Sequence, residues 1–217
     1  LKLADICRKH NIIVLSDEIH CDLLFDGFSH TPFASLNEWT KQNSLTCMAP
    51  SKTFNLSGLS TSYVIVPNAN LKAKFDKLAS TLHINLGNIA GTIAASAAYT
   101  HGDNWLEQLM DYIEANFEYL NNFFKQYLPA VELMKPEATF LVWLDFRKYN
   151  LDDQKLNDIM LREAKVGLNR GSTFGKEGEG FMRINIACPL SVLSDACNRI
   201  YDAFKNINIE NNSANID

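Results

Sequence analysis

The chain has 217 residues, 47% of them apolar and 21% charged, a composition typical of a globular protein with a buried core. Its formal net charge of −5 is spread along the sequence, and no basic block or stripe indicates nucleic acid or an anionic membrane as a partner. No apolar run reaches the length of about 18 residues that a membrane span needs, and no signal peptide is visible. We therefore expect a cytoplasmic protein.

The chain opens inside a helical pattern. Residues 1–10 alternate apolar and polar side chains at helical spacing, without an initial Met and without a capping residue before the helix. Natural chains seldom start inside an uncapped helix. We therefore expect a C-terminal fragment of a longer protein, and we expect apolar side chains of residues 1 to about 100 to be exposed by the missing part.

Apolar and β-branched runs predict three strands in the first half of the chain. The continuous run Ile12–Ser16 is typical of a strand buried on both faces of a parallel sheet. Shorter strands are predicted at 44–48 and 62–66. Helices are predicted at 71–82 and 88–99, and the many small residues of the second suit a closely packed, buried helix.

The second half begins with a long amphipathic helix, from about residue 103 to about residue 128. Asn104 and Glu107 have the spacing of a capping box at its start. After it, the pattern predicts strands and helices in alternation: strands at 139–146 and 182–187, and helices at 154–165 and 194–207. This alternation predicts an α/β fold with two domains, residues 1–102 and 103–217.

Three polar side chains lie at or near the carboxyl ends of predicted strands, where open α/β sheets collect their ligands. They are the carboxylate of Asp17, the amine of Lys52 and the guanidinium of Arg183. An enzyme that handles amino acids with pyridoxal 5′-phosphate (PLP) needs these three groups. The amine forms a Schiff base, the carboxylate keeps the pyridine nitrogen protonated, and the guanidinium binds the substrate carboxylate.

Each of these residues, taken alone, also has an ordinary explanation. Asp17 could be a turn residue, Lys52 a solvated surface lysine, and Arg183 the ion-pair partner of a nearby acid such as Glu179. Composition and spacing leave these alternatives open.

Longer motifs around these residues resemble a known family. The segments are SDEIHCDL at 16–23, APSKTFNLSGL at 49–59, GDNWL at 102–106, ATFLVWLDF at 138–146 and GFMRINIACP at 180–189. In this order they resemble the fold-type I PLP-dependent enzymes, aminotransferase class I/II, and among these the cystathionine β-lyase or C–S lyase branch (MalY/PatB type). The resemblance covers nearly the whole chain. It implies the PLP-dependent transferase fold, with part of the parallel-rich sheet of the large domain followed by the small α/β domain.

The resemblance also implies roles for individual residues. Asp17 matches the aspartate on the pyridine nitrogen, Lys52 the Schiff-base lysine and Arg183 the arginine that binds the substrate α-carboxylate. His20 stands where many aminotransferases have a tyrosine near the ring hydroxyl. Ser51 is the candidate for contact with the cofactor phosphate.

Two positions depart from the common aminotransferase pattern. A phosphate-binding serine three residues before the lysine is Ala49 here, and an arginine eight residues after it is Ser60. Other phosphate contacts of the family lie upstream of Leu1. We therefore expect the chain on its own to bind PLP weakly and to be inactive.

The function that the resemblance implies is cleavage of a sulfur amino acid to a thiol, pyruvate and ammonia by a homodimer. An aminotransferase shares the first steps and is the alternative reaction. A third possibility is a non-catalytic, aminotransferase-like regulatory domain, whose DNA-binding segment would lie outside this chain.

The cysteines and histidines do not indicate a metal site. Neither residue type has ligand spacing, so we expect no metal. The five cysteines are an odd number without CxxC spacing, and buried free thiols in a reducing compartment explain them best. The glycine-rich segment 171–180 is predicted to be a turn near Arg183.

Overall fold

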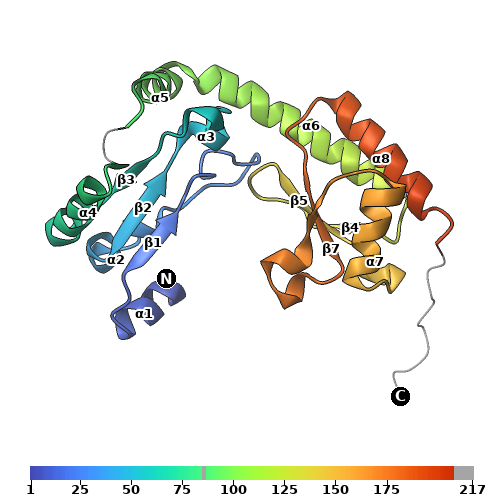
Figure 1. Ribbon diagram of the computed structural model, residues 1–217, viewed down its shortest axis with the longest axis horizontal. Coiled ribbons are helices and arrows are strands. Elements are labelled where there is room, and N and C mark those ends of the chain that lie inside the picture. The colour runs from blue at the N-terminus through green and yellow to red at the C-terminus, as the bar shows by residue number, and fades with distance from the viewer. Residues whose placement is uncertain (85–86, 208–217) are drawn as a thin grey trace. The chain divides into compact units, whose positions relative to one another are not determined.

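The computed structural model of the chain describes residues 1–84 and 87–207 and divides into two compact units, Leu1–Leu109 and Met110–Asp217 (Figure 1). The division lies inside helix α6 (Asp103–Tyr127), whereas the predicted domain boundary lies at the start of this helix. The last residues of the predicted second domain, 208–217, lie outside the described residues.

A three-stranded sheet with the order β1-β2-β3 forms the centre of the first unit (Figure 1). β1 (Val14–Asp17) runs parallel to β2 (Ser44–Met48), and β3 (Tyr63–Ile65) runs antiparallel to β2. The three predicted strands are confirmed, with ends that differ by up to two residues. Helices alternate with them, so the predicted α/β class is confirmed.

Asparagine side chains start three of the helices in this unit. Asn37, Asn68 and Asn88 each accept hydrogen bonds from backbone N–H groups of the first turn, which otherwise lack a partner. The helices of the unit before α6 are α1 (Lys2–Lys9), α2 (Glu38–Gln42), α3 (Pro50–Thr53), α4 (Ala69–Thr81) and α5 (Ile89–His101).

Two predictions of burial in the first unit are wrong. β1 is not buried on both faces, because Leu15 is 67% exposed. α5 is not a buried helix, because Ile89 is 81% exposed and only Gly91 is buried, against Thr61. Among the described residues, nothing covers the outer face of either element. The expected apolar exposure of this unit is confirmed.

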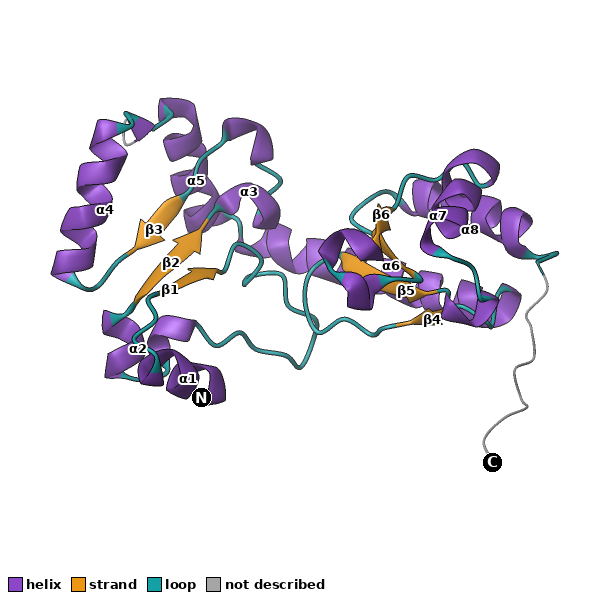
Figure 2. Cartoon of the chain, turned by 60° about the horizontal axis from the view of Figure 1, so that its bottom comes forward, coloured by secondary structure: helices purple, strands orange, loops and turns teal. Residues whose placement is uncertain are grey.

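An antiparallel sheet with the order β4-β5-β7-β6 forms the second unit (Figure 2). Its strands are β4 (Glu132–Leu133), β5 (Leu141–Asp145), β6 (Asn169–Arg170) and β7 (Phe181–Asn185), and its helices besides α6 are α7 (Asp153–Asp158) and α8 (Leu190–Phe204). Alternate residues of β5 and β7 are fully buried. They are Val142, Leu144, Met182 and Ile184.

Two local predictions in this part of the chain are wrong. The predicted helix at 154–165 is α-helical only to Asp158 and continues as a π-helix, Ile159–Glu163, in which the Ala164 N–H donates to the Ile159 carbonyl. Asn104 does not cap α6 but lies inside it, where its side chain accepts a hydrogen bond from Gln108. The helix starts earlier because the Leu106 N–H reaches the Gly102 carbonyl.

One buried polar side chain joins α6 to the segment that leaves β7. Asn116 is 1% exposed, and its Nδ2 donates to the carbonyl oxygens of Ile186, at 2.8 Å, and Cys188, at 2.9 Å. The amide thereby satisfies two carbonyl groups that have just left the sheet.

We predict that Asn116→Ala lowers the free energy of unfolding by about 1–3 kcal/mol, because it removes the partner of two carbonyl groups in the interior. Urea unfolding, followed by circular dichroism, measures the difference. Asn122→Ala is the matched control, since Asn122 is exposed on the same helix. Equal stability of the two variants would show that the Asn116 contacts contribute nothing.

Candidate active site

The structure brings the ends of β1 and β2 together. Asp17 is the last residue of β1 and pairs in register with Cys47 of β2. Lys52 lies in α3, which starts two residues after β2 ends. Because the two strands are parallel, their carboxyl ends lie at one edge of the sheet. The carboxylate and the amine predicted from the sequence therefore come from the same edge.

The Asp17 carboxylate is exposed. Its Oδ1 accepts the Ile19 N–H at 3.4 Å, a long hydrogen bond. Burial and then the negative charge of Asp17 raise the pKa of the neighbouring Cys47 thiol. Asp17 is thus a charged acceptor with most of its hydrogen-bonding capacity unused within the described residues.

Lys52 is half-buried, and within the described residues its amine makes no hydrogen bond or ion pair. The next residue, Thr53, is fully buried, and its hydroxyl donates to Asp22 Oδ2 at 2.9 Å. This bond fastens α3 to the loop that follows β1. It holds the segment of Lys52 to the segment of Asp17.

Two further predicted residues lie in the same loops. His20 is half-buried in the turn after Asp17, where the Leu23 N–H donates to the His20 carbonyl at 3.1 Å. Ser51 is half-buried beside Lys52, and its carbonyl accepts the Ser57 hydroxyl at 3.1 Å.

The sequence did not indicate the role of Glu18, the residue after Asp17. It is 6% exposed and binds three groups: the Ser16 hydroxyl at 2.8 Å, the Phe33 N–H at 3.0 Å and His30 Nε2 at 2.8 Å. Burial alone would raise the pKa of Glu18, but these hydrogen bonds, with His30 first, hold the pKa below its ordinary value. Glu18 thereby anchors the loop between β1 and α2.

Arg183 lies in the second unit, on the half-exposed face of β7. Its Nη2 donates to Asn169 Oδ1 at 3.1 Å, and its Cζ lies 4.3 Å from the centroid of the Phe174 ring. Among the described residues it forms no ion pair with Glu179, the acid that the sequence offered as an ordinary partner. Asn169 was missed because its contact depends on the pairing of β6 with β7.

The donor groups of the first unit fit PLP in part. An amine and a carboxylate from one sheet edge suit a Schiff base and a pyridine nitrogen. The predicted departures stand where expected: Ala49 is buried before α3 and offers only a methyl group, and Ser60 has the left-handed backbone of a turn, with φ of 46°. Neither supplies the family's usual phosphate contact.

Other kinds of site are not indicated in the part of the chain that the structure describes. No group of three or more His, Cys, Asp or Glu side chains there could hold a metal ion, and no helix there is long and apolar enough to cross a membrane. The five cysteines are free: Cys7 and Cys197 are buried, and Cys21, Cys47 and Cys188 are half-buried.

Comparison with known proteins places this arrangement among similar chains. The family described as aminotransferase class I and II matches residues 1–200. Cystathionine β-lyase PatB of Bacillus subtilis (strain 168) is 46% identical over 202 residues, which cover 92% of this chain and 52% of that protein.

Solved structures are similar as well. Cystalysin of Treponema denticola, which contains PLP, superimposes with a TM-score of 0.89 at 32% identity, over 95% of this chain and 52% of that one. The PLP-bound C–S lyase of Staphylococcus hominis gives a TM-score of 0.82 at 34% identity, over 93% of this chain and 52% of that one. The chain spans about half the length of these relatives.

We predict that the Glu18 contacts stabilise the fold at neutral pH and lose this effect in acid. The folded pKa of Glu18 lies below its ordinary value, so the contribution is present above the unfolded pKa and disappears as pH falls through the folded pKa. Urea unfolding of the unchanged chain and of Glu18→Gln at about pH 7 and about pH 3 tests this. The stability gap should be wide at the higher pH and narrow at the lower one; a gap independent of pH contradicts the prediction.

Proposed function

Because the chain belongs to the aminotransferase class I and II family, we propose that the protein containing it is a PLP-dependent C–S β-lyase of the cystathionine β-lyase type. Its reaction would convert a sulfur amino acid to a thiol, pyruvate and ammonia. The observation that carries this choice within the family is the 46% identity to a cystathionine β-lyase over 92% of the chain.

The roles of the first-unit residues follow from their chemistry. Lys52 holds the cofactor through its amine, which has no competing partner among the described residues. Once substrate displaces this amine, Lys52 acts as the general base that takes the α-proton. Asp17 accepts a hydrogen bond from the pyridine nitrogen and keeps it protonated. When bound, PLP supplies an electron sink for the electron pair left at the α-carbon.

The remaining residues bind and orient. Arg183 pairs with the substrate α-carboxylate, for which a planar guanidinium is suited. His20 and Ser51 contribute to the cofactor shell, through loops held by backbone hydrogen bonds and the Ser57 hydroxyl. With the α-proton on Lys52 and the carboxylate fixed, the bond that breaks next is the one between the β-carbon and sulfur.

An aminotransferase is the second candidate, and the family's own description favours it. The two reactions share the steps that use Lys52, Asp17 and Arg183. They differ in where the proton goes: a lyase expels a thiolate from the β-carbon, whereas an aminotransferase returns the proton to the cofactor and needs a keto acid to continue.

We predict that the full-length protein, loaded with PLP, releases pyruvate continuously from cystathionine when no keto acid is present. Lactate dehydrogenase coupled to NADH oxidation measures the pyruvate. A single turnover that stops until a keto acid is added would refute the lyase and identify the aminotransferase.

The same assay tests the role of Lys52. Lys52→Ala should lower kcat by at least about 10²- to 10⁴-fold, the contribution of a positioned general base. Lys77→Ala is the control, because Lys77 is exposed on α4, and it should leave kcat unchanged. Full activity of Lys52→Ala would remove the basis of the proposal.

We also propose that the full-length protein is a cytoplasmic homodimer. The free thiols support a reducing compartment, and the exposed apolar side chains of the first unit, among them Leu15, Ile89 and Ile93, support association. Light scattering on the purified protein should give twice the mass of one chain, and cell fractionation should recover it in the cytoplasmic fraction. A monomer mass or a membrane fraction would contradict these proposals.

A further inference from the structure

We propose that Phe174 is a positioning residue, whose ring holds the Arg183 guanidinium in the orientation that receives a substrate carboxylate. This inference rests on the proposed function, in which Arg183 binds that carboxylate. It assigns a task to the glycine-rich loop 171–180, which the sequence indicates only as a turn.

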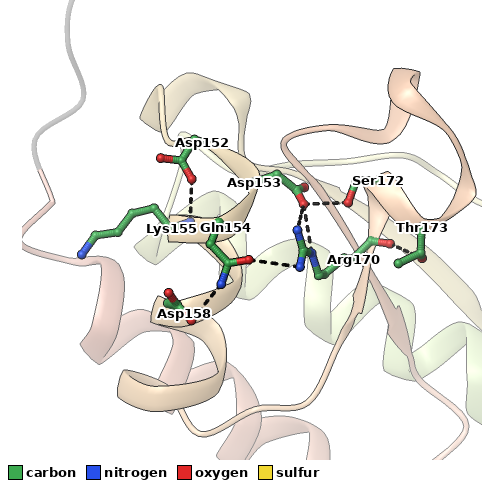
Figure 3. Close-up of polar contacts among 8 residues, drawn as sticks. All are labelled: Asp152, Asp153, Gln154, Lys155, Asp158, Arg170, Ser172 and Thr173. Atoms are coloured by element: carbon green, nitrogen blue, oxygen red, sulfur yellow. Dashed lines mark hydrogen bonds and ion pairs between the residues drawn. The ribbon is translucent and has the colours of Figure 1, made fainter.

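The first step is the anchoring of the loop. Figure 3 shows Asp153, at the start of α7, pointing toward Arg170 and Ser172, the residues on either side of Gly171. Its Oδ2 accepts Arg170 Nε at 2.9 Å and the Ser172 hydroxyl at 2.6 Å. Burial alone would raise the pKa of Asp153, but the hydrogen bonds from Ser172 and Arg170 hold it below its ordinary value. A charged carboxylate thus holds the chain two residues before Phe174.

The second step is the close return of the loop on itself. A Cβ atom added to Gly171 would lie 2.1 Å from the Gly178 carbonyl oxygen, so only glycine allows the two segments to meet. Gly175, directly after Phe174, has φ of 136°, a backbone that residues with a side chain rarely adopt. These constraints fix the backbone on both sides of Phe174.

The third step is the contact itself. Phe174 is 52% exposed, so burial does not explain its position. The guanidinium of Arg183 lies over its ring at 4.3 Å, within cation–π distance, and Trp143 packs edge-on against the same ring with centroids 5.4 Å apart. Trp143 is also the register partner of Arg183 across β5 and β7. The ring is therefore held from one side and supports the cation on the other.

The remaining donors of Arg183 lie at the end of the side chain. Nε is buried without a hydrogen-bond partner in the described residues, and Nη2 gives one hydrogen to Asn169. The hydrogens of Nη1 and the second hydrogen of Nη2 are left for a ligand. A carboxylate that approaches this end needs the guanidinium plane to be fixed, and the flat face of Phe174 limits its rotation.

The chain offers a matched control in Phe181. Phe174 and Phe181 both line a cavity of about 380 Å³ and both pack edge-on against Trp143. They differ in the cation that they carry, because the ring of Phe181 lies under Arg147, at 4.6 Å, and not under Arg183. Loss of an aromatic ring from either position thus disturbs the same cavity, but only one loss releases Arg183.

The experiment uses the full-length protein loaded with cofactor and the variants Phe174→Leu, Phe174→Tyr and Phe181→Leu. Isothermal titration measures the Kd of alanine, which has the carboxylate, and of ethylamine, which lacks it. Phe174→Leu should raise the Kd of alanine and the KM of the sulfur substrate about 2- to 30-fold, the range of a cation–π contact, with kcat and the Kd of ethylamine unchanged. Phe174→Tyr keeps the ring and should restore both values, and Phe181→Leu should leave them unchanged.

Three results would overturn the inference: an unchanged Kd for alanine in Phe174→Leu, an equal loss for alanine and ethylamine, or an equal loss in Phe181→Leu. Arg183→Lys separates this failure from that of the proposed function. If Arg183→Lys weakens alanine and Phe174→Leu does not, Phe174 has no positioning role and the role of Arg183 stands. If neither weakens alanine, the proposed substrate role of Arg183 fails as well.

Discussion

The parallel pairing of β1 with β2 is the constraint on which the candidate site depends. It brings the carboxyl ends of both strands to one edge, so that Asp17 and the helix of Lys52 leave the sheet side by side. A shift of one residue in this register would turn the Asp17 side chain to the opposite face of the sheet. Hydrophobic burial cannot enforce the register alone, because Leu15 is largely exposed. The hydrogen bonds of the loops that follow the strands carry much of that task.

Both units use a carboxylate to hold a functional loop. In the first, Glu18 binds a hydroxyl, a backbone N–H and a histidine, and Asp22 accepts the hydroxyl next to Lys52. In the second, Asp153 binds the segment that carries Phe174. These acids lie beside the residues with proposed chemical roles and do not share them. A charged acceptor with several donors fixes a loop more firmly than neutral hydrogen bonds do, and its own pKa falls as a result.

The residues proposed for catalysis have the opposite character. Within the described chain, Lys52 has no partner and Asp17 has one long hydrogen bond, while Arg183 is supported from the side by a ring and an amide. Their capacity is left for a cofactor and a substrate. This division between satisfied anchoring groups and unsatisfied reacting groups is what preorganisation requires, since a reacting group tied to the protein would have to break that bond first.

The sequence by itself determined the elements and the reacting groups. The strand at 44–48, the helices around 71–82 and 88–99, and the positions of Asp17 and Lys52 after strands follow from local periodicity and from motif wording, which need no knowledge of distant contacts. Only the tertiary structure decided how far β1 and α5 are buried, because exposure depends on what packs against an element and not on its composition. It also decided that Arg183 meets Asn169 and Phe174 and not Glu179, because that choice is made by the register of β6 on β7 and by the return of a glycine loop, both of which join residues far apart in local pattern.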